Sequence, residues 1–211
     1  MTNTKYSSGF TLVEVLITLA IIGIVAVITI PVVVNSAQNL EFRSAAQKAF
    51  SVASNATNLI INENGMSLAN AFTSGSDAIN KYAEKMNSIK KCNSARNDGC
   101  WSPTYTGGPS SAQSNVSGMV LNDGSFFVFL ATDPSCVSSS GNAKNACGEI
   151  YIDTNGFKNP NQVGKDILQF VVYQYGLRLA GTNSDYYQIN INGYRCPNGS
   201  NPILCQLELF N

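Results

Sequence analysis

The chain has 211 residues, of which 44% are hydrophobic and only 12% are charged, and its 13 basic and 13 acidic side chains give a net charge of zero. Disordered chains combine low hydrophobicity with high net charge, so this composition argues against that class. Nucleic-acid binding through a basic surface is disfavoured too, because neutralising phosphates requires an excess of Lys and Arg. The absence of His excludes Ser-His-Asp and Cys-His catalytic sites and His-ligated metal centres.

The apolar residues are concentrated near the amino terminus. Residues 10–34 form a run in which Glu14 is the only charge. As a helix this run spans about 37 Å, enough to cross a hydrocarbon core of about 30 Å. The polar leader at residues 1–9 carries Lys5, which places the amino terminus in the cytoplasm by the positive-inside rule. A cleaved secretory signal peptide is the alternative, but its apolar core is shorter, about 7–15 residues.

A carboxylate inside a membrane helix needs an explanation. Burying Glu14 at the bilayer centre costs about 2–3 kcal/mol, and less near the interface. One interpretation is that the side chain lies close enough to the interface to stay hydrated. The other is that it finds a cationic partner within the membrane.

Residues 9–14 read GFTLVE and are followed by the long apolar run. This pattern resembles the class III signal of type IV pilins and type II secretion pseudopilins, in which a Pro is also common at the place of Pro31. The resemblance implies that a prepilin peptidase cuts between Gly9 and Phe10 and that the new amine of Phe10 is methylated. It further implies that Glu14 faces the Phe10 amine of a neighbouring subunit during assembly, so that each charge offsets the burial of the other.

The helical pattern continues beyond the membrane run as an amphipathic extension over residues 35–64, and Asn64-Gly65 is a stop signal. Pro31 removes one helical hydrogen bond, which predicts a kink or a loosened turn. Two helices broken near residues 35–39 remain the alternative to one long helix.

The rest of the chain, residues 65–211, is predicted to form an α+β globular domain. A second helix is predicted from Asp77 to Lys91, with a Lys cluster (85, 90 and 91) at its carboxyl end, where cations suit the helix dipole. Asn122-Asp123-Gly124 predicts a hairpin turn. Strands are predicted at residues 116–121, 125–131, 149–152, 167–175 and 186–191. The predicted fold is therefore a long amino-terminal helix packed on a carboxyl-terminal antiparallel sheet, as in pilins.

All six Cys follow the membrane run, and an even number on the outside of a membrane predicts three disulfides. Their positions form three local couples. The predicted pairs are Cys92–Cys100, Cys136–Cys147 and Cys196–Cys205.

Residues 150–166 show a second, weaker resemblance, to a run in the globular domains of pseudopilin-like proteins, some of which bind calcium in this general region. Asp153, Asn155 and Asp166 are the candidate ligands, because Ca²⁺ takes carboxylate and amide oxygens. The spacing is not that of an EF-hand, since the closing Glu is missing. Turns capped by Asp and Asn side chains are the simpler interpretation of the same residues.

These features together predict a non-enzymatic structural subunit of a type II secretion pseudopilus or a related pilus-like filament. Its expected partners are a prepilin peptidase/N-methyltransferase, other subunits of a homo-oligomeric filament, and an inner-membrane assembly platform driven by a cytoplasmic ATPase. No nucleic-acid partner is expected, and no cofactor other than the candidate calcium ion. The expected location is the bacterial inner membrane, with a single span and a periplasmic carboxyl-terminal domain.

Two alternatives stay open at the level of sequence. The first alternative is a major or minor type IV pilin that serves adhesion, motility or DNA uptake. The second is a membrane-tethered binding domain or enzyme with no filament role.

Overall fold

The computed structural model describes residues 9–102, 116–131, 133–137, 146–180 and 210. Two helices come first, α1 (Leu12–Glu63) and α2 (Gly75–Lys85). The strands that follow are β1 (Ser88–Cys92), β2 (Ser117–Leu121), β3 (Phe126–Ala131), β4 (Ala146–Asp153), β5 (Ile167–Tyr173) and β6 (Gly176–Leu179). A long amino-terminal helix followed by an antiparallel sheet confirms the predicted α+β class. The chain divides into two compact units, residues 1–41 and 42–211.

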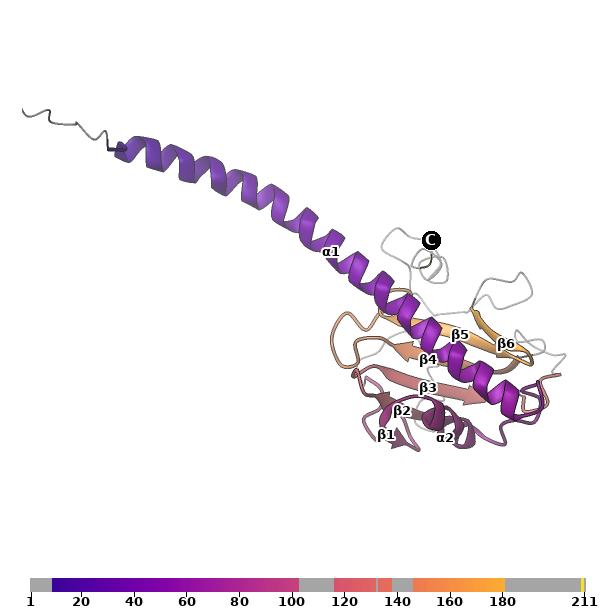
Figure 1. The fold of residues 1–211 in the computed structure, drawn as a ribbon. Coiled ribbons are helices and arrows are strands. Elements are labelled where there is room, and N and C mark those ends of the chain that lie inside the picture. Colours follow the sequence, from indigo (N-terminus) through magenta and orange to yellow (C-terminus); the bar gives the residue numbers. More distant parts are fainter. Residues whose placement is uncertain (1–8, 103–115, 132, 138–145, 181–209, 211) are drawn as a thin grey trace, which may run out of the picture. The chain divides into compact units, whose positions relative to one another are not determined.

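The described strands form one sheet in the order β1-β2-β3-β4-β5-β6, and each strand pairs antiparallel with its neighbour in sequence (Figure 1). This order is a meander, which needs only short connections. Every residue of the central strand β4 is buried. A strand buried on both faces shows no alternation of polar and apolar residues. Other segments of the chain must therefore cover both faces of the sheet at β4.

Helix α1 is continuous from Leu12 to Glu63, so the alternative of two helices broken near residues 35–39 does not describe this structure. It ends at the predicted stop signal. Gly65 has a left-handed backbone (φ +73°), and the Met66 N–H donates to the Ile61 carbonyl at 2.8 Å. This arrangement satisfies a terminal carbonyl group that has no partner inside the helix.

Within the second unit, α1 supplies small side chains to the core. Ala46, Ala53 and Ala56 are at most 1% exposed and share one core with the sheet. Small side chains on the helix leave room for large ones on the sheet, and interiors favour such complementary filling. The sheet contributes Met119, Phe127, Phe129, Ile150, Ile152, Leu168 and Phe170 to this core.

Helix α2 packs against β1, β2 and β3. Its Tyr82 is completely buried, and the Tyr82 hydroxyl lies 2.9 Å from that of Thr57 on α1. Thr57 donates its own proton to the Ala53 carbonyl at 2.7 Å, so Tyr82 is the donor of the shared bond. Burial raises the pKa of Tyr82 and keeps this hydroxyl protonated. The hydrogen bond therefore joins the two helices inside the core.

The predicted end of the second helix at Lys91 is wrong. Helix α2 ends at Lys85, because Met86 has extended backbone (φ −122°, ψ 146°) and residues 88–92 pair with β2 as strand β1. Sheet pairing here outweighs the helical pattern of the isolated segment. Lys90 and Lys91 consequently lie on an edge strand, and Lys85 alone remains in the last helical turn.

Four of the predicted strands correspond to β2, β3, β4 and β5, with ends that differ by up to three residues. Strands β1 and β6 were not predicted. The four residues of β6 are too few to show a pattern, and β1 was assigned to the helix before it. The predicted strand at residues 186–191 lies outside the described residues.

Two disulfides join Cys92 to Cys100 and Cys136 to Cys147, and these are two of the three pairs that the sequence predicts. The third predicted pair, Cys196–Cys205, lies outside the part of the chain that the structure describes. Within the described residues every Cys is in a disulfide.

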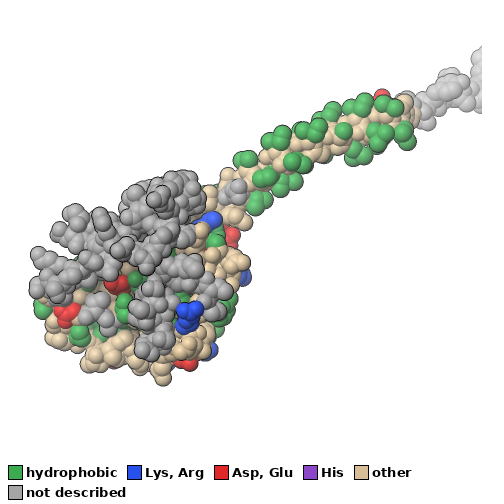
Figure 2. Space-filling model, turned by 180° about the vertical axis from the view of Figure 1, so that it is seen from behind, with side chains coloured by type: hydrophobic (Ala, Val, Ile, Leu, Met, Phe, Trp, Pro, Cys, Tyr) green, Lys and Arg blue, Asp and Glu red, His purple; other side chains and the backbone are tan. Residues whose placement is uncertain are grey.

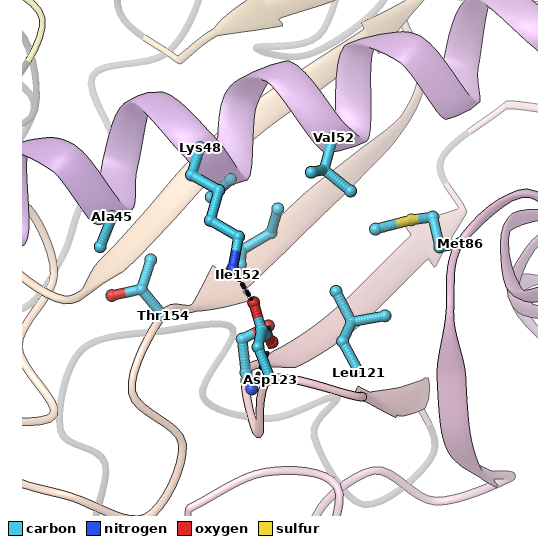
Figure 3. A pocket seen from close by; sticks show the side chains of 10 residues that line it. Ala45, Lys48, Val52, Met86, Leu121, Asp123, Ile152 and Thr154 are labelled. Carbon is cyan, nitrogen blue, oxygen red and sulfur yellow. Dashed lines mark hydrogen bonds and ion pairs between the residues drawn. The ribbon is translucent and has the colours of Figure 1, made fainter.

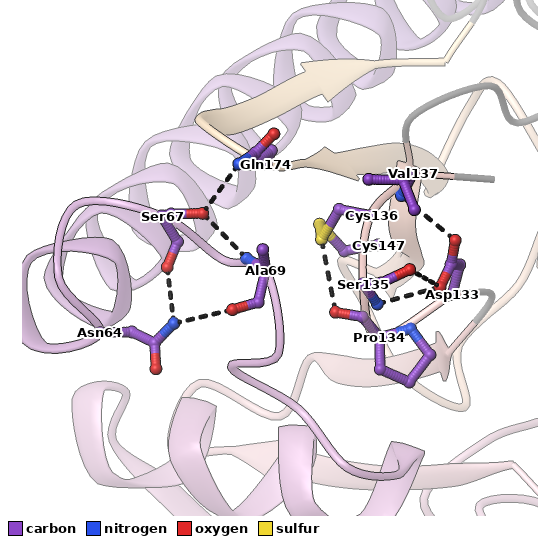
Figure 4. Close-up of a disulfide and its surroundings, with 10 residues drawn as sticks. All are labelled: Asn64, Ser67, Ala69, Asp133, Pro134, Ser135, Cys136, Val137, Cys147 and Gln174. Atoms are coloured by element: carbon purple, nitrogen blue, oxygen red, sulfur yellow. Dashed lines mark hydrogen bonds between the residues drawn. A yellow bond between two sulfur atoms is a disulfide. The ribbon is translucent and has the colours of Figure 1, made fainter.

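The segment that follows α1 is tied to the sheet by polar side chains (Figure 4). The Asn64 amide donates to the Ser67 carbonyl at 2.7 Å, and the Gln174 amide, which follows β5, donates to the Ser67 hydroxyl at 3.2 Å. The Asn70 N–H donates to the Pro134 carbonyl at 2.6 Å, next to the disulfide loop. The carboxyl end of α1 is thus fixed to two connections of the sheet.

Gly156 lies where the turn after β4 meets the turn between β2 and β3. Its backbone is left-handed (φ +67°), and a Cβ atom there would lie 2.5 Å from the Gly124 carbonyl oxygen. Gly65 has a similar backbone (φ +73°) but nothing within 4 Å of such an atom. Substitutions at these two glycines therefore separate the cost of a left-handed backbone, which both share, from the cost of the close contact, which only Gly156 has.

We predict that Gly156→Ala destabilises the fold by about 2–4 kcal/mol and Gly65→Ala by about 1 kcal/mol. Thermal melting of the full chain in detergent, followed by circular dichroism, measures the difference. The first variant should melt several degrees lower than the second. Equal melting temperatures for the two variants would contradict the role of the Gly124 contact.

Candidate functional site

Helix α1 begins with a reciprocal capping arrangement between Thr11 and Glu14. The Glu14 Oε2 atom accepts the Thr11 N–H at 2.8 Å and the Thr11 hydroxyl at 2.7 Å, while the Glu14 N–H donates to the Thr11 hydroxyl oxygen at 3.3 Å. This is a capping box, which satisfies N–H groups that have no partner within the helix. The Thr11 N–H and the Thr11 hydroxyl thus both donate to the same carboxylate oxygen, Glu14 Oε2. Within the described residues, Glu14 Oε1 accepts no hydrogen bond.

Gly9 and Phe10 lie just before this cap and are exposed, Phe10 by 89%. A Cβ atom at Gly9 would meet nothing within 4 Å. The described part of the chain therefore gives no steric reason for glycine at this position.

The first part of α1 has an apolar surface (Figure 2). The large hydrophobic side chains from Leu12 to Val34 are 46–78% exposed. The helix is long and apolar enough to cross a membrane. Its two threonines donate to carbonyls of the preceding turn, Thr18 to Val15 and Thr29 to Val25, both at 2.9 Å. Hydroxyls satisfied within the helix are compatible with hydrocarbon, where no water replaces a missing partner.

Pro31 lies inside α1 without interrupting it. Because proline has no N–H, it cannot donate to the carbonyl of Val27 in the preceding turn. The predicted kink or loosened turn at Pro31 stays a prediction.

A cavity of about 180 Å³ lies between α1 and the sheet in the second unit (Figure 3). Its lining is mostly apolar and includes one ion pair, in which Lys48 Nζ lies 2.6 Å from Asp123 Oδ2. Burial raises the pKa of Asp123, but hydrogen bonds from Lys48 and Ser125 outweigh burial, so the net pKa is lowered. Since the two charges satisfy each other, the ion pair joins the helix to the β2–β3 turn rather than presenting a charge to a ligand.

The predicted calcium ligands lie together at the connection between β4 and β5. Asp153 is the last residue of β4 and Asp166 directly precedes β5; both are 0% exposed. The Asp153 Oδ1 atom accepts the N–H groups of Asn155 at 3.2 Å and Gly156 at 2.9 Å. This turn matches the simpler interpretation, in which an Asp side chain caps a turn. It accounts for only one of the two Asp153 oxygens.

The two oxygens of Asp166 have partners of their own. Oδ2 accepts the Asn161 N–H at 2.8 Å and Oδ1 accepts the Gln162 N–H at 2.6 Å. The Asp166 carboxylate therefore shapes the backbone around Asn161, which has a left-handed conformation (φ +51°). Sequence analysis did not single out Asn161, because its role depends on this fold-back onto Asp166.

Three buried oxygens of this connection have no hydrogen-bond partner among the described residues: Asp153 Oδ2, Asn155 Oδ1 and Asn161 Oδ1. The side-chain amide groups of Asn155 and Asn161 are both directed at Asn159, the first at its carbonyl (3.3 Å) and the second at its Oδ1 (3.5 Å). Because each amide nitrogen donates to Asn159, the other terminal atom of each side chain is its oxygen, Oδ1. Buried oxygens without a donor are rare and call for a partner. We call Asp153, Asn155, Asn161 and Asp166 the oxygen cluster.

The electrostatics of the oxygen cluster are unfavourable without a cation. Burial raises the pKa of Asp153, and the nearby Asp166 carboxylate raises it further, to about 7; the Asn155 and Gly156 N–H groups lower it in part. Among the described residues no Lys or Arg forms an ion pair with Asp153 or Asp166. The described residues also contain no cluster of three or more His, Cys, Asp and Glu side chains, so the donor set is two carboxylates and two amides.

Comparison with known proteins identifies only the amino-terminal segment. Residues 4–30 match the family described as the prokaryotic N-terminal methylation motif. The chain therefore carries the class III prepilin signal of type IV pilins and pseudopilins, which confirms the predicted resemblance. No curated protein and no solved structure matches the chain.

The signal implies processing by a peptidase, assembly with other pilin-like subunits and association with a membrane. Together with the long helix and the antiparallel sheet, it supports a type IV pilin-like precursor. One residue of this segment was missed by the sequence analysis. Thr11 is the amino-terminal partner of the capping box, and its signal, a Thr three residues before a Glu ahead of an apolar run, was present in the sequence.

The raised pKa of Asp153 predicts a pH dependence of stability in buffer containing a chelator. The folded state holds a proton on Asp153 up to about pH 7, while the unfolded chain loses it near pH 4. The folded state therefore binds more protons in this interval, and the free energy of unfolding falls as the pH rises through it, by about 2–4 kcal/mol.

Melting curves of the wild type and of Asp153→Asn at pH 5.5 and pH 8 measure this contribution. The Asn side chain keeps the acceptor for Asn155 and Gly156 but does not titrate. We expect the stability difference between the two pH values to shrink in the variant. A difference of the same size in both proteins would show that Asp153 is not its source.

Proposed function

We propose that the chain is the precursor of a structural subunit of a type II secretion pseudopilus or a related pilus-like filament, and that it is not an enzyme. The prepilin signal at the start of α1 carries this proposal. The same helix continues without a break into the core of the sheet domain. One continuous helix therefore carries both the signal at its start and, at its end, side chains of the domain core.

The first part of α1 is the membrane anchor of this proposal. Its exposed apolar surface suits lipid, and Lys5 ahead of it favours a cytoplasmic amino terminus. This orientation assigns the sheet domain to the periplasm. The two disulfides support the assignment, because disulfides persist in oxidising compartments and are rare in the cytoplasm.

Processing is proposed at the peptide bond between Gly9 and Phe10. Hydrolysis leaves the new carboxylate on Gly9 of the leader and a new amine on Phe10. The same peptidase/N-methyltransferase then transfers a methyl group to this amine from a methylsulfonium donor, which leaves as the thioether while the nitrogen loses a proton. The exposure of both residues gives access to the bond. The lack of any internal reason for glycine at position 9 supports a role in contact with the peptidase.

Glu14 has two roles in this proposal, one in each state of the subunit. In the single chain its Oε2 atom completes the capping box with Thr11. In the filament its Oε1 atom receives the Phe10 ammonium of a neighbouring subunit, so that two costly charges in a low-dielectric environment neutralise each other. The capping bonds hold the carboxylate in place before the partner arrives.

We predict that co-expression with a prepilin peptidase yields a mature chain that begins at Phe10. Amino-terminal sequencing and intact mass, which detects the added methyl group, measure the outcome. Gly9→Leu should block cleavage while leaving the domain folded, because a Cβ atom at residue 9 would meet no described atom within 4 Å. A mature chain with any other first residue would refute the proposed site.

We predict that Glu14→Gln keeps the helix start but abolishes filament assembly. Glutamine can complete a capping box, yet it carries no charge to pair with an ammonium. Glu14→Ala removes both properties and serves as the matched comparison. Filaments sheared from cells and seen by electron microscopy provide the measurement, and normal assembly of Glu14→Gln would contradict the pairing.

The same variant separates the two filament classes in the natural host. Loss of exoprotein secretion with intact surface motility is expected for a pseudopilus subunit. Loss of motility, adhesion or DNA uptake with intact secretion would instead support the type IV pilin alternative. Retention of all these activities would favour a membrane-tethered domain with no filament role.

A further inference from the structure

We propose that Tyr175 of one copy of this chain docks into the cavity between α1 and the sheet of a second copy, so that the sheet domains join head to tail. This inference rests on the proposed filament role and adds the two surfaces through which neighbouring domains meet. Both surfaces belong to the second unit, residues 42–211.

The two surfaces lie at opposite ends of the sheet. The β2–β3 turn, the end of β4 and the start of β5 share one end, because Asp153 pairs with both Phe126 and Ile167. The cavity lies at this end, where Thr154 forms part of its lining (Figure 3). The β5–β6 turn with Tyr175 lies at the other end, about 20 Å away along the seven residues of β5.

Tyr175 lies in a turn that does not need an aromatic ring. Gln174 and Tyr175 form the two-residue connection of the β5–β6 hairpin, since Tyr173 pairs with Gly176. Such connections favour Gly, Asn and Asp, which adopt tight-turn backbones easily. Tyr175 is 72% exposed, so neither the turn nor the core of its own chain explains the ring. Tyr is also among the side chains that contribute most to protein–protein interfaces.

A second exposed apolar side chain lies at the same end of the domain. Met66 is 66% exposed and has a left-handed backbone (φ +71°), a conformation that favours Gly or Asn. The next residue, Ser67, accepts the Gln174 amide on its hydroxyl at 3.2 Å (Figure 4). The segment after α1 and the β5–β6 turn therefore expose one large apolar side chain each, and neighbouring exposed apolar side chains mark interaction surfaces.

The cavity at the opposite end suits a tyrosine side chain. It measures about 180 Å³ and is mostly apolar. Its polar lining includes two hydroxyls whose protons are already donated. Ser125 donates to Asp123 Oδ1 at 2.6 Å, and Thr154 donates to the Asp166 carbonyl at 3.1 Å. Both hydroxyl oxygens can still accept a hydrogen bond. A phenol ring has an apolar body and one O–H donor, which matches this lining. The apolar walls are formed by Ala45, Ala49, Val52, Met86, Leu121 and Ile152.

The two surfaces cannot meet within one chain, because a paired strand of about 20 Å separates them. The occupant of the cavity must then be supplied by another molecule, and a second copy of this chain carries a matching side chain. A contact between two different surfaces is heterologous, and it extends as a filament when its rotation does not close a ring. A self-complementary contact would instead stop at a dimer. The head-to-tail contact therefore agrees with the proposed filament role.

The first test changes the docking side chain in the full chain, expressed in the natural host. Tyr175→Ser should lower the yield of sheared filaments about tenfold or more, as expected for an interface hot spot, while Tyr175→Phe, which keeps the ring, should lose much less. Ile89→Ser is the matched control, because Ile89 is similarly exposed (70%) but lies on the edge strand β1, outside the cavity lining. An equal loss in Tyr175→Ser and Ile89→Ser would overturn the proposal.

The second test fills the cavity from its own wall. Ala45→Phe should lower the filament yield as Tyr175→Ser does. Gln47→Phe adds the same ring at an exposed position of α1 outside the lining and should assemble normally. All variants should keep the mature amino terminus at Phe10 and the melting temperature of the wild type within a few degrees. Normal assembly of Ala45→Phe would show that Tyr175 does not occupy this cavity.

The third test identifies the contact directly. Tyr175→p-azidophenylalanine keeps an aromatic ring and makes it photoreactive. After irradiation of filaments built from isotopically light and heavy copies, mass spectrometry should find residue 175 joined to residues 45–52, 121–125 or 152–154 of another copy. Filaments without such a cross-link would overturn the contact and leave the filament role intact. A wild-type chain that is processed at Phe10 but never assembles would overturn both.

Discussion

The packing of one alanine-rich face of α1 against the aromatic layer of the sheet is the interaction on which the globular unit depends. Ala46, Ala53 and Ala56 are buried against a core that includes Phe127, Phe129 and Phe170. Large side chains on both sides would overfill this space, and small ones on both sides would leave cavities. The sheet therefore needs this helix to cover one face, and the second helix and the loop after α1 are arranged around the same contact.

The two ends of α1 differ in sequence. Its first part exposes Leu, Ile and Val side chains in all directions, which suits lipid, while its last part confines apolar residues to one face. Polar groups in the first part are satisfied locally, by the Thr11–Glu14 cap and by hydroxyls that donate to the preceding turn. Among the described residues, no cation pairs with the carboxylate of Glu14. This unpaired charge is the physical reason to propose a cationic partner on another molecule.

Sequence reasoning succeeded where the signal was local and strong. The long helix, its stop at Asn64-Gly65, the hairpin after β2 and the pairing of Cys92 with Cys100 all follow from residues close together in the chain. It failed where distant partners decide the outcome. Residues 88–92 follow a helical pattern, but β2 offers them backbone hydrogen bonds, and so they form a strand. Asn161 was not predicted for the same reason. Its position depends on a hydrogen bond from its N–H to Asp166, which sequence spacing does not reveal.

The contrast between a recognisable amino terminus and an unmatched remainder has a physical basis. In the proposed function, residues 9–14 must fit a peptidase and neighbouring helices closely, which would restrict their sequence tightly. A hydrophobic core that covers a helix, by contrast, can be built from many sequences of similar volume and pattern. The connections of the sheet domain contain few apolar residues, and two disulfides restrain them. A disulfide stabilises such a loop mainly by limiting the freedom of the unfolded chain, so it acts where burial of apolar surface is small. The hydrophobic core under α1 and the two disulfides therefore stabilise different parts of the same sheet domain.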